Sequence, residues 1–474
     1  MLEHIFLIPI LLGILCFFLP SRLGRGVLVG GGLATLAGAS ALWFGDQPGG
    51  GAYFQVTPEG QLVLLVVSFL FVLVTVYTLG YLRDAPIRRE PIFLGCMLLC
   101  LGTMSMVALA DHIIVLWVAI EATTLVSAPL ILLHHSKEAL EATWKYVMVC
   151  SVGIALALLG GFFTIMAMGS GNVDLSLTFH GLAGEAAAFD PSWLKAGFIF
   201  LLIGYGTKMG LAPMHTWLPD AHSEAPSPAS ALLSGMLLNC AFLGVFKAHL
   251  LMTAAGLAVF SGSLLVVFGL LSVLVAAVFI IQQNDYKRLL AYSSIENMGI
   301  IAFGIGIGGL AAYGAMIHLI HHALIKSSLF LSAGNILLGY GTKMIADTGR
   351  LARFQPRTAI ALVGGFAGIS GFPPFGIFLS ELLIIFGAFQ KGSYSSVAVL
   401  IFSLILIFAG ASRSIIRISF SNWEGQMKIG ENLPRIAPSW ILLLTSIGLT
   451  VWMPEKMEQI IQAVMTAIGG SLHG

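Results

Sequence analysis

The sequence predicts an all-helical polytopic membrane protein with about fourteen transmembrane helices, of which the seventh and twelfth are broken. Hydrophobic residues make up 58% of the 474 positions, and Asp, Glu, Lys and Arg together only 9%, whereas soluble domains carry about 25% charged residues. The apolar residues gather in runs of about 20, the length that crosses a bilayer. Basic residues fall between alternate runs, which supports the helix count because one missed helix would scramble the alternation.

The expected helices follow one another along the whole chain. By residue number they are 3–20, 26–44, 61–82, 91–109, 112–133, 142–168, 195–213, 228–252, 258–283, 286–307, 310–338, 359–390, 395–418 and 436–454. The interruptions are Pro213 in the seventh helix and Pro373 and Pro374 in the twelfth. Proline lacks the backbone N–H and crowds the preceding turn, so each helix must break or kink there.

The placement of Lys and Arg predicts the orientation in the membrane. Sixteen of the 23 basic residues fall in loops after odd-numbered helices, four fall within helices, and only Lys195, Lys391 and Lys456 lie on the other side. Since basic residues concentrate on the cytoplasmic side, we expect the odd loops in the cytoplasm and both termini outside.

Helices 4–8 share their spacing of polar residues and prolines with helices 9–13. The matched pairs are Glu121 and Glu296, Lys145 and Lys326, and Pro213 and Pro374. Because five is an odd number, the second unit must enter the membrane from the opposite side, and broken helices in inverted repeats indicate ion or substrate sites near the midplane. We therefore predict four parts: helices 1–3 (1–90), a first repeat of helices 4–8 (91–252), a second, inverted repeat of helices 9–13 (258–418), and helix 14 with a C-terminal tail (419–474).

Lys208 is the main candidate for an ion path. An apolar run precedes it and Pro213 follows it. Ionisable residues inside the membrane are functional candidates by default, and backbone freed at a helix break must be buried in protein or line a wet cavity. Glu121 is the expected partner, because opposite charges stabilise each other, and a changing carboxylate charge would switch the lysine's protonation. The alternatives are a lysine that snorkels to the interface and a static ion pair.

Three residues of the eleventh helix, His318, His322 and Lys326, are spaced to line one helix face. Both ring nitrogens of histidine can relay protons, so we interpret the three as a proton relay rather than as core histidines. A metal site is not expected, because no nearby carboxylate or cysteine completes the ligand set. Glu381 follows the second break and would end a row that begins with Glu121 and Lys208.

Other polar residues within the helices are secondary candidates for the same path. They are Glu296, Lys145, His215, Asp220, His222, Lys247 and His321. Lys145 and Lys247 stand near helix ends, where they can snorkel instead. The five cysteines lie in apolar runs without C-x-x-C spacing and are interpreted as small core residues. The sequence has no Walker loop, cysteine cluster or G-x-S-x-G element, so no cofactor is expected in this chain, and a net charge of +1 gives no reason to expect nucleic acid.

Four motifs resemble the antiporter-like subunits of respiratory complex I, multisubunit Na⁺/H⁺ antiporters and membrane-bound hydrogenases. They are Trp117-x-x-x-Glu121, Lys208-x-x-x-x-Pro213-x-His215-x-Trp217-Leu218-Pro219-Asp220-Ala221-His222, Asp285-x-Lys287-Arg288-Leu289-Leu290-Ala291-Tyr292-Ser293-Ser294, and His322-Ala323-Leu324-x-Lys326-x-x-Leu329-Phe330-Leu331. The resemblance covers nearly the whole chain and implies fourteen helices, two inverted repeats and a proton path. By motif match Glu121 and Lys208 look like the family's helix-5 and helix-7 pair, Lys326 like its central lysine, and Glu381 like its helix-12 residue.

Two segments look like component F of hydrogenase-4-type complexes, relatives of formate hydrogenlyase: residues 234–240 and residues 294–299. Asn239 stands where some complex I subunits carry a helix-8 lysine, and Glu296 where those paralogues are usually uncharged. The resemblance implies a proton-translocating subunit of a nickel–iron hydrogenase-type complex in a prokaryotic inner membrane. Its partners would be other membrane subunits and a peripheral hydrogenase and iron–sulfur arm. The alternatives are a complex I or Mrp-type antiporter subunit and a non-conducting structural anchor.

Overall fold

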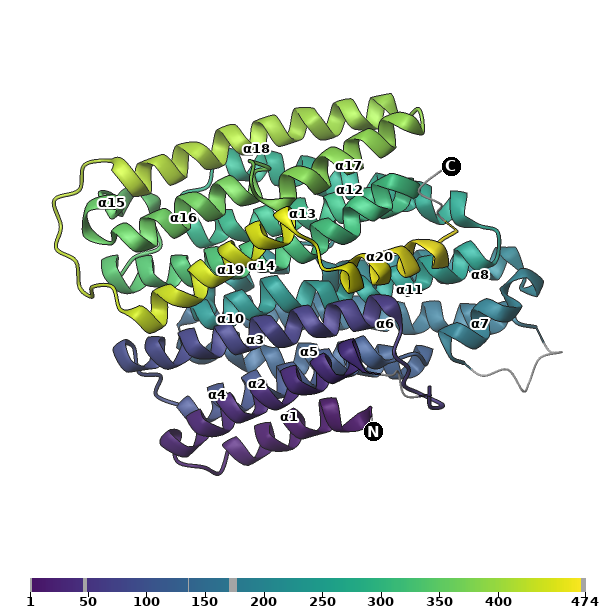
Figure 1. Ribbon diagram of the computed structural model, residues 1–474, viewed down its shortest axis with the longest axis horizontal. Coiled ribbons are helices and arrows are strands. Elements are labelled where there is room, and N and C mark those ends of the chain that lie inside the picture. Colours follow the sequence, from purple (N-terminus) through teal and green to yellow (C-terminus); the bar gives the residue numbers. More distant parts are fainter. Residues whose placement is uncertain (1, 46–48, 135, 170–176, 470–474) are drawn as a thin grey trace.

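A computed structural model describes residues 2–45, 49–134, 136–169 and 177–469, and this part of the chain is helical without a β-strand beyond isolated bridges. The helices are α1 (Glu3–Cys16), α2 (Ser21–Phe44), α3 (Pro58–Asp84), α4 (Glu90–Leu109), α5 (Ile113–Ile131), α6 (Lys137–Ala167), α7 (Phe179–Glu185), α8 (Pro191–Met209), α9 (Trp217–Glu224), α10 (Ser227–Leu232), α11 (Leu238–Ala254), α12 (Ala258–Ile281), α13 (Tyr286–Ile307), α14 (Gly309–Tyr340), α15 (Leu351–Phe354), α16 (Pro356–Ile369), α17 (Gly376–Gln390), α18 (Tyr394–Phe420), α19 (Leu433–Val451) and α20 (Glu455–Ala467). Most of them run along one common direction, and both chain ends lie at the same side of the bundle (Figure 1). That side is called the terminal side below.

The predicted set of about fourteen transmembrane helices is confirmed. Eleven helical spans of the described chain, one of them formed by α10 and α11 together, are long and apolar enough to cross a membrane. The short helix α1 and the two broken pairs, α8 with α9 and α16 with α17, complete the set. The protein is therefore a multi-pass integral membrane protein.

The two inverted five-helix repeats are also confirmed as the plan of the fold. The first contains α4, α5, α6, the broken pair α8 and α9, and the continuous α10–α11; the second contains α12, α13, α14, the broken pair α16 and α17, and α18. In both repeats the third helix packs on the broken one: α6 on α8, and α14 on α16 and α17. A cis proline lies in each break, at Pro213 and at Pro374. The residue limits predicted for the four parts stay predictions.

The seventh helix breaks earlier than the sequence suggested. Asp190 caps the start of α8 by accepting hydrogen bonds from Ser192 and Trp193, and Pro191 occupies the first helical position. The helix ends at Met209, not at residue 213, because Gly210 takes the left-handed conformation (φ 86°) that closes helices. Lys208 therefore lies in the last turn of α8.

Two elements were not expected. A π-helical turn, Leu233–Leu237, joins α10 to α11 within the eighth transmembrane helix, and such turns occur often at functional sites. The predicted C-terminal tail forms α20 instead, because its apolar residues recur every three to four positions and bury one face. Helix α20 extends from α19 toward the terminal side (Figure 1) and packs on α3 and α14.

Candidate functional site

Lys208 is buried at the end of α8 among polar side chains of the first repeat. Its ammonium donates hydrogen bonds to Thr124 Oγ1 of α5 at 2.9 Å and to the Tyr146 hydroxyl of α6 at 2.5 Å. The Nζ atom also lies 4.5 Å from the centre of the Tyr146 ring and 5.9 Å from that of Trp217, within the range of cation–π attraction. The side chain has no exposed surface, so the interpretation of Lys208 as a snorkelling residue is wrong.

Glu121 does not form the expected direct pair with Lys208. One carboxylate oxygen accepts a hydrogen bond from Ser151 Oγ of α6 at 2.8 Å, and the other is buried without a hydrogen-bond partner among the described residues. No ion pair within 4.0 Å joins Glu121 to Lys208 in the described chain. The lysine reaches Thr124 instead, one turn further along α5, so the static ion pair is excluded for this conformation.

The Lys208 ammonium is the start of a short chain of hydroxyl groups. The Tyr146 hydroxyl, which accepts from Lys208, also lies 2.6 Å from Ser127 Oγ. Ser127 in turn donates to backbone oxygens of α5. Hydroxyl groups both donate and accept hydrogen bonds, so this chain can pass a proton from one oxygen to the next.

Lys326 of α14 is a fully buried cation of the second repeat, where it matches Lys145 of the first. Its ammonium donates to the Leu290 carbonyl oxygen at 2.7 Å and to Ser293 Oγ, both on α13. Glu296 lies on the same helix, nearly fully buried. The cation of α14 and the carboxylate of α13 thus belong to two packed helices, although no ion pair between them is present in the described chain.

His318 continues the polar face of α14 two turns before Lys326. Its Nε2 lies 2.9 Å from Asn297 Oδ1 of α13, and its Nδ1 lies 3.0 Å from Ser380 Oγ of α17. Both His318 and Lys326 therefore face α13, as their spacing predicted. The residue after Ser380 on α17 is Glu381, the predicted end of the row.

The other two histidines of α14 differ from each other. His322, between His318 and Lys326, is fully buried, and neither ring nitrogen has a hydrogen-bond partner in the described part of the chain. His321 points elsewhere, because its Nδ1 lies 2.9 Å from Ser446 Oγ of α19. The structure thus brings His322 into the row and separates His321 from it.

Glu381 lies at the second helix break. A side chain added at Gly371 would collide with its carboxylate, so the glycine leaves the room that this group occupies. Gly371 also has a φ of 69°, a conformation that other residues rarely adopt. Glu381 itself belongs to α17, after the break as the sequence predicted, and its carboxylate reaches back to Gly371 within the break.

Aromatic contacts connect the surroundings of the two buried lysines. The Tyr146 ring lies 4.9 Å from Trp217, Trp217 lies 6.4 Å from His222, and His222 stacks on Phe330 at 5.3 Å. Phe330 is one helical turn from Lys326 on α14. His222 is fully buried, with no side-chain hydrogen-bond partner among the described residues, so it is a polar group between the two centres.

Asp220 of α9 joins the two repeats by ion pairs. These pairs lie outside the row that leads from Glu121 and Lys208 to Glu381. It accepts from Lys145 of α6 at 2.5 Å and from Arg288 of α13 at 2.7 Å. Lys145 is therefore paired and 39% exposed. His215 lies within the first break, where its carbonyl accepts from the Leu218 N–H at the start of α9.

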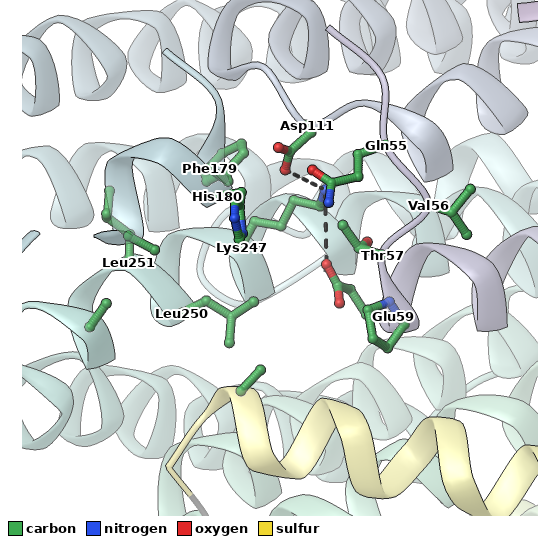
Figure 2. A pocket seen from close by; sticks show the side chains of 14 residues that line it. Gln55, Val56, Thr57, Glu59, Asp111, Phe179, His180, Lys247, Leu250 and Leu251 are labelled. Atoms are coloured by element: carbon green, nitrogen blue, oxygen red, sulfur yellow. Dashed lines mark ion pairs between the residues drawn. The ribbon is translucent and has the colours of Figure 1, made fainter. Parts of the chain in front are cut away.

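Lys247 is not a snorkelling residue either. It is 1% exposed, donates to the Ala110 carbonyl oxygen at 2.7 Å, and lies 3.8 Å from Asp111 and 3.9 Å from Glu59. Figure 2 shows this cluster at the edge of a cavity. It lies toward the terminal side, because Glu59 is at the start of α3 and Asp111 follows α4.

The hydroxyl and amide ligands were missed from the sequence. Lys208 bonds to Thr124 and Tyr146, Lys326 to Ser293, and His318 to Asn297. A signal existed, because Ser293 and Asn297 are four residues apart within an apolar run and so share a helix face. No cluster of three or more His, Cys, Asp or Glu side chains suited to a metal occurs among the described residues, and all five cysteines are buried and free. The absence of a metal and of a cofactor stays a prediction.

The fold and this site define a class: multi-pass membrane proteins with inverted repeats and charged residues buried at broken helices. A family model described as NADH:quinone oxidoreductase/Mrp antiporter, transmembrane, matches residues 110–407. The chain belongs to this family of antiporter-like membrane subunits, as the motifs implied.

Individual proteins that are similar to this chain are subunits of the same kinds of membrane complex. The chain is 36% identical over 439 residues to a hydrogenase-4 component F homolog of Methylacidiphilum infernorum, covering 90% of both chains. It is 29% identical over 400 residues to NADH-quinone oxidoreductase subunit N of Desulforudis audaxviator, covering 81% of this chain and 78% of the relative. Among solved structures, a chain of the membrane-bound sulfane sulfur reductase, an archaeal respiratory membrane complex, has the same fold, with a TM-score of 0.87 at 22% identity over 99% of this chain and 98% of the other.

Proposed function

We propose that this chain is the proton-translocating subunit of a membrane-bound nickel–iron hydrogenase complex of the hydrogenase-4 or formate hydrogenlyase type. The observation that carries the proposal is the pair of fully buried lysines, Lys208 at the broken helix of the first repeat and Lys326 on the third helix of the second, each hydrogen-bonded to at least one hydroxyl group. Buried charges inside a membrane are costly, and two of them, one in each repeat, suit a path for ions better than helix packing does.

The proton path runs along the membrane through both repeats. In the first repeat Lys208 exchanges protons with the hydroxyls of Tyr146 and Ser127. The charge of Glu121, one turn before Thr124 on α5, affects the protonation of Lys208. His222 lies between the repeats. In the second repeat the proton moves among Lys326, His322 and His318 and ends at Glu381. Because neighbouring charges affect one another strongly in a low-dielectric interior, the row acts as one coupled set.

The hydrogenase branch is supported by the relative that is 36% identical over 90% of both chains. The chain would hold no cofactor, so the redox chemistry would belong to partner subunits: other membrane subunits and a peripheral arm with hydrogenase and iron–sulfur centres. Sixteen basic residues lie in the loops after odd-numbered helices and three lie on the terminal side. Because basic residues concentrate on the cytoplasmic side, this supports a cytoplasmic arm and external termini. The membrane would be a prokaryotic inner membrane.

Two experiments test this function. The first is mass spectrometry of the proteins that co-purify with the tagged chain; a nickel-hydrogenase large subunit is the expected result, and NADH-dehydrogenase or Mrp-type subunits would move the chain to the complex I or Mrp alternative. The second is proton uptake by liposomes that contain this complex and the dye pyranine.

In the second experiment Lys208→Met should remove proton uptake while redox turnover and subunit composition persist. Lys195→Met is the matched control, because Lys195 contacts the Phe260 ring at 5.5 Å, outside the row. An assembled Lys208→Met complex that still pumps at the wild-type rate would leave the chain as a structural anchor.

A further inference from the structure

A cavity of about 240 Å³ lies on the terminal side of the first repeat, away from the lysine row. Its lining includes Gln55, Thr57, Glu59, Asp111, His180 and Lys247 (Figure 2). These residues come from the start of α3, the connection between α4 and α5, α7 and α11, and Ala467 of α20 also lines the cavity. Polar groups from four parts of the chain thus converge on one space.

The charges around this cavity do not balance. Lys247, Glu59 and Asp111 are 1%, 3% and 2% exposed, so one cation faces two buried carboxylates. The lysine donates its one short hydrogen bond to a backbone carbonyl, Ala110 O at 2.7 Å, and both carboxylates lie further away, at 3.8 and 3.9 Å. A buried excess charge is costly unless another charge neutralises it, so the site favours one more positive charge. His180 of α7 is the other titratable residue that lines the cavity.

Helices α8 and α11 pack together between this cavity and Lys208. Gly244 lies three residues before Lys247 on α11, and a side chain there would meet the Tyr205 ring. Tyr205 is on α8, one turn before Lys208. The Tyr205 hydroxyl and Asn239 Oδ1 are both buried, and within the described chain neither has a hydrogen-bond partner.

We propose that this cavity is the place where the first repeat exchanges protons with the aqueous phase of the terminal side, with Lys247 as the proton carrier and Glu59 and Asp111 as its exchange partners. A proton from water neutralises one carboxylate, passes to the Lys247 nitrogen when the ammonium has given its own proton inward, and reaches Lys208 past Tyr205. The inference rests on the proposed function, because it adds an opening to that path.

The test replaces the lysine and then restores its charge chemically. In the liposome assay Lys247→Cys should lower proton uptake about tenfold or more without changing subunit composition. Treatment with 2-aminoethyl methanethiosulfonate attaches an aminoethyl group through a disulfide and should restore most of the uptake, because the new ammonium lies at nearly the length of lysine. The same reagent applied to the wild type is the control for the five native cysteines, all of them buried.

The outcomes separate this inference from the proposed function. Unchanged uptake in Lys247→Cys, alongside loss in Lys208→Met, would overturn the opening and leave the function standing. If Lys247→Cys loses uptake and the reagent does not restore it, Lys247→Arg decides between the two explanations. Retained uptake in Lys247→Arg supports a charged proton carrier at this position. If the assembled Lys247→Arg complex loses as much uptake as Lys247→Cys, Lys247 only packs the helices and the inference is overturned. If neither Lys247→Cys nor Lys208→Met lowers proton uptake, the proposed function itself is wrong.

Discussion

The two repeats hold their buried lysines by different means. Lys208 bonds only to side-chain hydroxyls, from α5 and α6, whereas Lys326 bonds to a backbone carbonyl and one serine, both on α13. A hydroxyl can release a proton as well as accept a hydrogen bond, and a carbonyl oxygen can only accept. The first repeat therefore surrounds its lysine with groups that can exchange protons, while the second fixes its lysine and supplies histidines nearby.

The carboxylates Glu121 and Glu381 also have different surroundings in the two repeats. Glu121 is tied to Ser151 of a neighbouring helix, while Glu381 occupies the room left by a glycine in a helix break. The two repeats thus place their carboxylates on different helices, α5 and α17. We infer that the first repeat switches the lysine through hydroxyl contacts and the second through the histidines of α14, and the following predictions test that difference.

The largest expected effect is in the second repeat. Lys326→Met should reduce proton uptake to the background, as is expected of Lys208→Met, because Lys326 is the lysine of the proposed path in the second repeat. The measurement is pyranine fluorescence in liposomes that contain the tagged complex. Lys391→Met, which removes an exposed lysine just after α17, is the control. Uptake above one-tenth of the wild-type rate in Lys326→Met would mean that the repeats do not work in series.

An intermediate effect is expected for Tyr146→Phe. The change removes the hydroxyl between Lys208 and Ser127 but keeps the ring, so the cation–π contact persists. Loss of one hydrogen bond to a charged group is worth about 1.5–3 kcal/mol, so proton uptake should fall roughly tenfold or more. Tyr81→Phe, in a buried tyrosine of α3 that stacks on Tyr77, controls for the loss of a hydroxyl. If both variants pump equally well, the hydroxyl chain is not part of the path.

Much of the fold could be predicted from the sequence because bilayer crossing leaves a strong pattern. Apolar runs give the helices, and prolines give the approximate breaks. The end of α8 was misplaced by four residues because Gly210, and not Pro213, closes that helix. Helix α20 was missed because its apolar residues form a stripe rather than a run, and it is too short and too charged to resemble a transmembrane helix.

The candidate site was partly predictable for a different reason. Charged residues such as Lys208 and Lys326 stand out in apolar segments, so they could be found directly. Their ligands could not, because serine, threonine and tyrosine are common in membrane helices and only helix packing decides which of them faces a lysine. Lys247 shows the limit most clearly. From the sequence it is a secondary candidate for the path that can snorkel instead, because its partners Glu59 and Asp111 are far away in the sequence and only the fold brings them to 3.9 and 3.8 Å from it.

The smallest expected effect is at the contact between the repeats. Asp220→Asn removes ion pairs to Lys145 and Arg288, whose side chains are 39% and 38% exposed, and exposed pairs contribute at most about 1 kcal/mol each. Because both pairs lie outside the proposed path and act on stability, proton uptake should fall no more than about threefold, with a slightly lower unfolding temperature of the complex in differential scanning fluorimetry. Glu224→Gln, which removes a comparable pair with Lys343, is the matched control. If Asp220→Asn alone stopped uptake as completely as Lys208→Met, Asp220 would belong to the path itself, and the proton would cross between the repeats at α9 rather than past His222.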